Sequence, residues 1–341
     1  MLGATVKMKR NLKILSLILA LVFITGIFGA CTNSTNQQAS ETTKAIDTSV
    51  KNTTTEKYPM TLEDSKGTQV TLKAKPAKIV SLPLGTCEML MSLVDKSRIA
   101  AMTYYVDDAK VSNIADEAKG VGKRIESNAE KIIALQPDLV LMDNLADANV
   151  VKQLRDANIT VFMLNTPSNV DEVKDNLKII GKIVGEEAKA QDLIKWMDQK
   201  LKDVSDRIEL MTDDQKQTVL DYSEMSTTSG KGTNFDDIVT RAGLINPVSK
   251  AGLEGWPELS KEMIIKYNPQ IIILPSWYYD TKVNFYSLNE KIKGDKALAN
   301  IKAVKNNKII TVPYNHISST SQYAVLAVED IAKVAYPGLF K

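Results

Sequence analysis

Short apolar runs alternate with helix-like segments over residues 75–341, and this alternation constrains the fold more than any other feature of the sequence. Such runs have the length of buried strands, and the segments between them repeat apolar residues about every 3.6 positions. The expected strands are 79–84, 99–103, 138–142, 160–164, 217–222, 270–274 and 308–312, and the expected helices lie near 86–94, 128–135, 147–157, 234–242, 260–267 and 320–335. Strands that alternate with helices predict an α/β fold with mostly parallel sheets covered on both faces.

Residues 169–210 interrupt this alternation because they contain no strand signal. They are charged and amphipathic, which predicts one helix that ends near Val184 and a second, long helix over 186–210. We therefore expect two lobes of similar size, 58–185 and 211–341, joined by this long helix.

Residues 1–30 have the layout of an export signal, in which four cationic residues precede the apolar run 14–28 and small residues then lead to Cys31. Either Met1 or Met8 could be the start. A transmembrane anchor is the alternative, because the length of this apolar run is close to the roughly 20 apolar residues that a spanning helix needs. The cysteine directly after small residues resembles the lipobox of bacterial lipoproteins. We therefore expect lipidation of Cys31 and anchoring at the outer face of the cell membrane.

Residues 31–57 hold almost no large apolar side chains and predict a disordered tether. Without residues 1–30, which carry four positive charges and no negative ones, the formal net charge falls from +2 to −2. A nearly neutral body gives no reason to expect nucleic-acid binding. If Cys31 is lipidated, Cys87 has no partner in the chain, and we interpret it as a small buried hydrophobic residue.

Aromatic side chains follow the ends of several expected strands, where ligands of open parallel sheets bind. Only 6% of the chain is aromatic, so their grouping is informative, although each ring alone could cap a core. As a set they predict the wall of a ligand cleft, with Arg124 as a cationic counterpart. The candidate wall residues are Tyr104, Tyr105, Trp256, Trp277, Tyr278, Tyr314 and His316.

Catalytic and metal-binding signatures are missing from the sequence. A Ser-His-Asp triad would have to use His316, the single histidine, and no G-x-S-x-G elbow occurs. The SGKG run at 229–232 lacks the spacing of a phosphate-binding loop. Zinc or manganese sites usually need several His or Cys ligands. We expect neither an enzyme nor a metal site.

Five segments in a fixed order resemble the solute-binding lipoproteins of ABC importers for iron-siderophore, haem and cobalamin. They are the D-x-x-G-x-x-V-x-L run with KPAKIVSL near the start, NAEKIIALQPDLVLM, WPELSKEMIIKYNPQIIIL, AVKNNKIITVP and YPGLF. The resemblance covers about residues 58–340. It implies the class III periplasmic-binding-protein fold, with two Rossmann-like lobes joined by a single long α-helix.

The resemblance also implies roles for individual residues. Glu130 and Glu262 match the glutamates that dock each lobe onto the membrane permease, although both are also acids favoured at helix starts. Arg124 matches an arginine that contacts the iron-bound oxygens in hydroxamate-siderophore binders. His316 could ligate haem or cobalt, but a lone histidine is more often a hydrogen-bonding wall residue.

The leading hypothesis is a monomeric protein without a resident cofactor that captures a ferric siderophore and delivers it to a permease and its ATPase. Haem or cobalamin binding by the same fold is the first alternative. A surface adhesion or sensory module that uses the aromatic cleft for a protein or glycan partner is the second.

Overall fold

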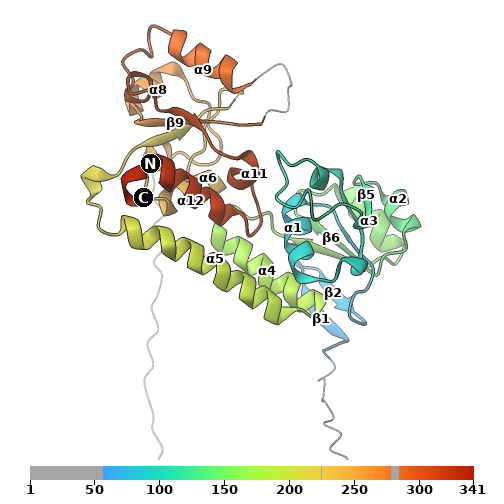
Figure 1. The fold of residues 1–341 in the computed structure, drawn as a ribbon. Helices are drawn as coiled ribbons and strands as arrows, with labels where there is room; N and C mark the ends of the chain where they lie inside the picture. Colours follow the sequence, from blue (N-terminus) through green and yellow to red (C-terminus); the bar gives the residue numbers. More distant parts are fainter. Residues whose placement is uncertain (1–56, 224, 278–283) are drawn as a thin grey trace, which may run out of the picture. The chain divides into compact units, whose positions relative to one another are not determined.

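Parallel sheets flanked by helices form the framework of the protein (Figure 1). The computed structural model describes residues 57–223, 225–277 and 284–341. Over these ranges a five-stranded sheet has the order β5-β4-β3-β6-β7 and a three-stranded sheet has the order β10-β9-β8, and every neighbouring pair in them is parallel. The expected α/β fold with two lobes is confirmed.

The first lobe surrounds the five-stranded sheet. A short antiparallel hairpin, β1 (Met60–Glu63) and β2 (Gln69–Leu72), precedes it. Strands β3 and β7 are buried along their whole length, as expected for a parallel sheet with helices on its faces. The elements are β3 (Ile79–Ser81), α1 (Leu84–Leu93), β4 (Ile99–Thr103), β5 (Lys123–Ile125), α2 (Ala129–Ala134), β6 (Leu139–Asp143), α3 (Ala148–Asp156) and β7 (Val161–Leu164), with 3-10 helices at Lys96–Arg98 and Tyr104–Asp107.

The second lobe surrounds the three-stranded sheet, whose central strand β9 is fully buried. Its elements are β8 (Val219–Asp221), α6 (Asn234–Arg241), α7 (Pro247–Lys250), α8 (Lys261–Tyr267), β9 (Ile271–Leu274), α9 (Phe285–Gly294), α10 (Lys302–Lys305), β10 (Ile309–Thr311), α11 (Tyr314–Ile317) and α12 (Ala324–Ala335), with 3-10 helices at Asp213–Gln215 and Pro337–Leu339.

Two antiparallel helices, α4 (Val170–Val184) and α5 (Glu187–Ile208), lie between the lobes in sequence. Gly185 ends α4 in the left-handed conformation, with φ 69°, which lets the chain reverse within two residues. The helices then approach so closely that a Cβ atom on Gly181 would lie 2.6 Å from the Cβ of Ala190. Glycine at position 181 is therefore required by packing.

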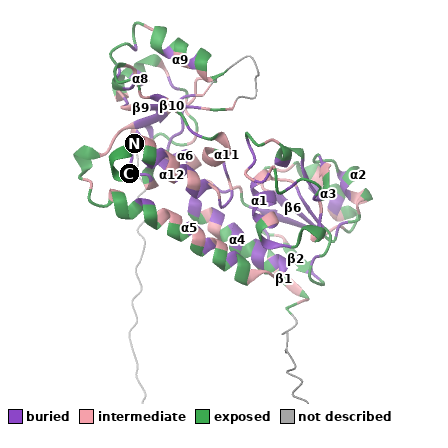
Figure 2. Cartoon of the chain, viewed as in Figure 1, coloured by how far each residue is buried: buried purple, intermediate pink, exposed green. Residues whose placement is uncertain are grey.

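Helices α5 and α12 contribute to the cores of both lobes. Figure 2 shows buried positions along α5 on the side that faces α4 and α12. Ile194 of α5 and Val325 of α12 pack in the core of the first lobe, whereas Val204 and Val328 of the same helices pack in the core of the second. Both lobes are thus held by two shared helices rather than by the connecting helix alone.

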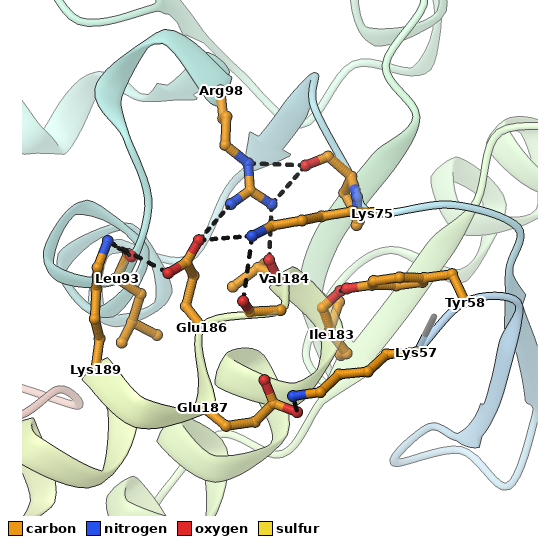
Figure 3. Close-up of polar contacts among 12 residues, drawn as sticks. Lys57, Tyr58, Lys75, Leu93, Arg98, Ile183, Val184, Glu186, Glu187 and Lys189 are labelled. Carbon is orange, nitrogen blue, oxygen red and sulfur yellow. Dashed lines mark hydrogen bonds and ion pairs between the residues drawn. The ribbon is translucent and has the colours of Figure 1, made fainter. Parts of the chain in front are cut away.

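A polar cluster fastens the first lobe to the turn between α4 and α5 (Figure 3). The guanidinium of Arg98 donates to the carbonyl oxygen of Pro76 at 2.9 and 2.6 Å and to that of Val184 at 2.9 Å, and it pairs with the carboxylate of Glu186 at 3.1 Å. Lys75 also donates to Glu186 at 2.9 Å. Arg98 therefore joins the loop before β3 to the end of α4 and the start of α5.

Several elements were not predicted from the sequence. Strands β1 and β2, strand β5 and helix α9 are absent from the expected set, and the expected strand 79–84 ends at Ser81 because α1 begins at Leu84. Strand β5 has only three residues, of which Lys123 is exposed and Arg124 half-buried, so no apolar run marks it. Arg124 thus lies on an edge strand of the sheet.

Candidate ligand-binding cavity

A cavity of about 580 Å³ lies between the two lobes, next to the carboxyl ends of β6, β7, β8 and β9. Small-molecule pockets usually measure about 300–1000 Å³, and open parallel sheets bind ligands at this end of their strands. The aromatic residues of its described wall are Tyr222, Phe235, Trp256 and Tyr314. The polar groups of that wall are mostly hydroxyls and amides, so the cavity suits a bulky ligand with many hydrogen-bonding groups.

The wall from the first lobe consists of the loops after β6 and β7. The side-chain oxygen of Asn144 accepts hydrogen bonds from the backbone N–H of Thr166 at 3.1 Å and from its hydroxyl at 2.7 Å. Asp143 accepts from the backbone N–H of Leu145 at 3.1 Å. These bonds fix the two loops and hold Leu145 at the cavity with 77% of its surface exposed. Leu145 thus adds an apolar side chain to the cavity wall.

Asp221 supplies a carboxylate at the end of β8. Its Oδ1 accepts from the Thr228 hydroxyl at 2.8 Å and the Ser229 backbone N–H at 2.7 Å, and its Oδ2 accepts from the Ser229 hydroxyl at 2.6 Å. Burial raises the pKa of Asp221, although the bonds from Ser229 and Thr228 act in the opposite direction. Within the described cavity wall, Asp221 is the one acid, and no lysine, arginine or histidine is present.

Trp256 projects from a loop that is tied to the segment 227–231. The backbone N–H of Gly230 donates to the carbonyl oxygen of Gly255 at 2.7 Å, and that of Lys231 donates to Leu253 at 2.8 Å. A Cβ atom on Gly230 would lie 2.3 Å from the carbonyl oxygen of Leu253, so only glycine fits there. The loop presents Trp256 at the cavity with 72% of its surface exposed.

The structure brings together some of the predicted aromatic wall and separates the rest. Trp256 and Tyr314 line the cavity, and the ring of Trp277 lies 5.2 Å from that of Tyr314. Tyr104 and Tyr105 pack on each other at 4.3 Å on an exposed 3-10 helix and do not line the cavity. Tyr278 and Cys31, the expected lipidation site, lie outside the described residues.

Arg124 is engaged within the first lobe. Its guanidinium makes two 2.7 Å bonds to the carboxylate of Asp107, and it donates to the carbonyl oxygens of Ala118 at 2.8 Å and Val121 at 2.7 Å. Hydrogen bonding and charge from Arg124 lower the pKa of Asp107. Arg124 does not line the cavity, and its contact with a chelate stays a prediction.

His316 lies on the short helix α11 rather than on a loop. Its Nδ1 atom is 2.6 Å from Oδ2 of Asp330 on α12, and the side chain is 22% exposed. The residue does not line the cavity, although Tyr314 and Ile317 of the same helix do. Its role as a metal ligand stays a prediction.

Glu130 and Glu262 are exposed in the first turns of α2 and α8, one in each lobe. Hydrogen bonds from its own backbone N–H and from Ser260 lower the pKa of Glu262. An acid in the first turn also interacts favourably with a helix N-terminus, and the docking role of both residues stays a prediction.

A buried carboxylate connects α1 to the segment after α11. Glu88 accepts from the backbone N–H of Asn113 at 2.7 Å and from its side-chain amide at 3.0 Å, and it accepts from the hydroxyls of Ser319 and Ser321. Burial raises the pKa of Glu88. The amides of Asn113 and Asn315 also bond across the lobes, with Asn315 donating to the Asn113 side chain at 2.9 Å and Asn113 to the Asn315 carbonyl at 2.7 Å. This network holds the lobes together beside the cavity.

Sequence reasoning missed the polar part of the cavity wall. Asn144 and Thr166 lie just after β6 and β7, Asp221 is the last residue of β8, and Ser229 lies in the loop after β8, where polar residues are common. The one feature of the sequence that could have identified them is their position near the carboxyl ends of strands, because these ends lie along one edge of a parallel sheet.

The described part of the chain holds no group of three or more His, Cys, Asp or Glu side chains placed to bind a metal ion. It also contains no helix long and apolar enough to cross a membrane.

The fold and the cavity between its lobes define a class of solute receptor. Residues 79–315 match the periplasmic binding protein family, and the chain belongs to that family.

Individual relatives extend the match beyond those residues. The chain is 29% identical over 338 residues to YvrC of Bacillus subtilis, described as an uncharacterized ABC transporter substrate-binding lipoprotein, covering 96% of this chain and 97% of YvrC. It is 24% identical over 283 residues to a cobalamin-binding protein of Halobacterium salinarum, covering 82% of this chain and 73% of the relative. A crystal structure of a possible iron-binding (periplasmic solute-binding) protein of Staphylococcus epidermidis superimposes with a TM-score of 0.67 at 25% identity, covering 77% of this chain and 99% of that protein.

Proposed function

We propose that the protein is the solute-binding subunit of an ABC importer and that it captures a corrinoid in the cavity between its lobes. The observation that carries the proposal is the wall of this cavity, which combines aromatic rings with hydroxyl and amide groups. A corrinoid offers a broad ring with amide side chains at its rim, which can donate and accept hydrogen bonds. The cobalamin-binding relative from Halobacterium salinarum supports the same ligand class.

Capture needs no covalent chemistry. Trp256 and Tyr314 would exclude water from the faces of the ligand, while Asn144, Thr166 and Ser229 would bond to its amides. The two shared helices and the bonds of Glu88 hold the lobes in one arrangement, so we expect a small closure on binding. We infer no catalysis and no resident cofactor, and the chelate is cargo.

A ligand titration tests the proposal. The tryptophan fluorescence of the full-length chain, purified in detergent, is followed while cyanocobalamin, ferrichrome, ferric citrate or haem is added. We expect saturable quenching by cyanocobalamin, with the same dissociation constant from calorimetry. Binding of ferrichrome alone would replace the corrinoid by a siderophore, and a flat response to all four compounds would exclude solute capture from this group.

A ferric siderophore is the second candidate, favoured by the iron-binding description of the related Staphylococcus epidermidis protein. The predicted contact between Arg124 and a siderophore does not support this candidate, because the guanidinium of Arg124 binds Asp107 and two carbonyl oxygens of its own lobe. Haem with His316 as axial ligand has less support, because His316 does not line the cavity. An unchanged haem spectrum in His316→Ala would remove that candidate.

Delivery would place the loaded protein on a permease and its ATPase through Glu130 and Glu262. A surface adhesion or sensory module, the alternative, would bind its ligand without needing either glutamate for uptake.

We also propose that Cys31 carries a lipid after signal cleavage and that the protein works as an extracytoplasmic monomer. Mass spectrometry of the membrane fraction tests the lipid, since the mature chain should begin at a diacylglyceryl cysteine.

A further inference from the structure

One ionisable side chain stands apart in the described cavity wall. Asp221 is its single acid, and neither lysine, arginine nor histidine lines the cavity over the described ranges. The other polar groups, such as Asn144, Thr166 and Ser318, are neutral. A charge at this position therefore dominates the electrostatic character of the wall.

Hydrogen bonds hold the carboxylate of Asp221 in a fixed orientation at the cavity wall. Two hydroxyls and one backbone N–H bind its two oxygens at 2.6–2.8 Å and fix its orientation. A carboxylate can accept all three bonds, since each of its oxygens has two acceptor sites. Burial raises the pKa of Asp221, but the hydrogen bonds from Ser229 and Thr228 oppose this rise because they favour the ionised form. These partners are neutral, so they orient the negative charge without cancelling it.

Over the described residues Asp221 forms no ion pair, and its hydrogen-bond partners are Thr228 and Ser229. The cation of α9 next to this wall, Lys291, lies 5.9 Å from the ring of Tyr222 and does not line the cavity. At an effective dielectric constant of about 20, one charge acting on another about 8 Å away changes an affinity by a factor of about 30. One unpaired carboxylate is therefore sufficient to separate ligands by charge.

From this geometry we propose that Asp221 selects the charge of the transported solute, so that the cavity takes up neutral or cationic metal chelates and rejects anionic ones. The inference rests on the proposed solute-binding function and narrows its ligand class. Selection by repulsion is an economical route to specificity, because a single unfavourable group discriminates among ligands of similar shape. We therefore expect the cavity to bind neutral corrinoids and neutral or cationic hydroxamate chelates and to reject ferric citrate and carboxylate-bearing chelates.

A matched ligand pair tests the charge effect apart from shape. Cyanocobalamin and its monocarboxylic acid, in which one side-chain amide is hydrolysed, differ by one negative charge on the same ring. We expect the wild-type chain to bind the amide form at least about tenfold more tightly at pH 7.5, with the ratio falling as salt screens the charge. Equal affinities would overturn the inference.

The variant Asp221→Asn tests whether the charge of Asp221 causes the difference in affinity between the two ligands. The Asn oxygen can accept from Thr228 and from the Ser229 N–H, and its amide can donate to the Ser229 hydroxyl, so the local bonds are retained. The ratio of the two affinities should fall to within about threefold, a change that simple loss of packing would not produce. A ratio equal to that of the wild type would overturn the proposal.

Two further variants serve as an independent test of wall charge and as a control for net charge. Ser318→Lys places a cation on the exposed cavity wall and should shift the ratio toward the acid form even if Asp221→Asn folds poorly. Asp206→Asn removes the same charge from the outer face of α5, where Asp206 pairs with Lys202, and should keep the wild-type ratio. A shift of the ratio in Asp206→Asn as large as in Asp221→Asn would assign the effect to net charge and overturn the role of Asp221.

A second ligand pair separates the inference from the choice of ligand. N-acetyl and N-succinyl ferrioxamine B share one hydroxamate chelate and differ by one negative charge. If neither cobalamin binds, discrimination between the ferrioxamines would uphold charge selection while the corrinoid proposal fails. Binding without discrimination would overturn charge selection alone, and no binding of any of the four would overturn the solute-binding function and this inference with it.

Discussion

Replacing Arg98 with alanine should loosen the attachment of the first lobe to the helical connection. The guanidinium is 14% exposed and bonds to two carbonyl oxygens and to the carboxylate of Glu186 (Figure 3). Breaking a buried ion pair by removing one partner costs about 3–5 kcal/mol, but Glu186 keeps its 2.9 Å contact with Lys75. We therefore expect a loss of about 2–4 kcal/mol in the free energy of unfolding, since each hydrogen bond to a charged group contributes about 1.5–3 kcal/mol.

Thermal and urea unfolding, followed by circular dichroism, measure the effect. For a body of this size, the loss corresponds to a midpoint about 3–7 °C lower. Arg98→Lys keeps the charge but not the planar fork of donors, so its midpoint should lie between those of the wild type and Arg98→Ala.

A surface pair provides the control. Lys119 pairs with Asp116 at 2.6 Å, but both side chains are largely exposed. Lys119→Ala should unfold like the wild type, because exposed pairs contribute little. If Arg98→Ala also unfolds like the wild type, the cluster in Figure 3 does not stabilise the junction and the reasoning is refuted.

Three further predictions concern binding, delivery and pH. Trp256→Ala should weaken the binding of cyanocobalamin about tenfold in calorimetry while the melting temperature changes little, because the side chain is 72% exposed without ligand; an unchanged dissociation constant would remove Trp256 from the site. Charge reversal of Glu130 and Glu262 together should leave binding intact and reduce uptake of labelled ligand by cells, whereas normal uptake would argue against permease docking. Because burial raises the pKa of Glu88 in the folded state, its contribution to stability is greatest below the unfolded pKa of about 4.3 and declines as the pH rises toward the folded pKa. Glu88→Gln should remove this decline in urea unfolding measured from pH 4 to 7, and parallel curves for the two proteins would contradict it.

Much of the fold was predictable because buried parallel strands are continuous apolar runs. The runs at 99–103 and 270–274 became β4 and β9 with little change at their ends. Strand β5 was not predictable in this way, since its three residues are paired on one side only and include Lys123 and Arg124. Short edge strands owe their conformation to a neighbour, and a single sequence does not show that neighbour.

The candidate site was predictable in position more than in composition. The strand ends located the cavity, and Trp256 and Tyr314 line it. The partner of Arg124 is Asp107, 17 residues earlier and on another element, so the spacing of the sequence did not indicate that pair. Tyr104 and Tyr105 follow a strand as a cavity residue would, yet they pack on each other because their backbone turns into a 3-10 helix.

The sharing of α12 between the two cores has a consequence for the order of folding. Ala324 and Val325 complete the core of the first lobe, although the rest of that core comes from residues 70–197. On the ribosome the first lobe would therefore hold an unfinished core until α12 is made, and contacts so distant in sequence form slowly. We therefore expect the nascent chain to complete its first core only near the end of synthesis, and until then the unfinished core stays accessible to chaperones.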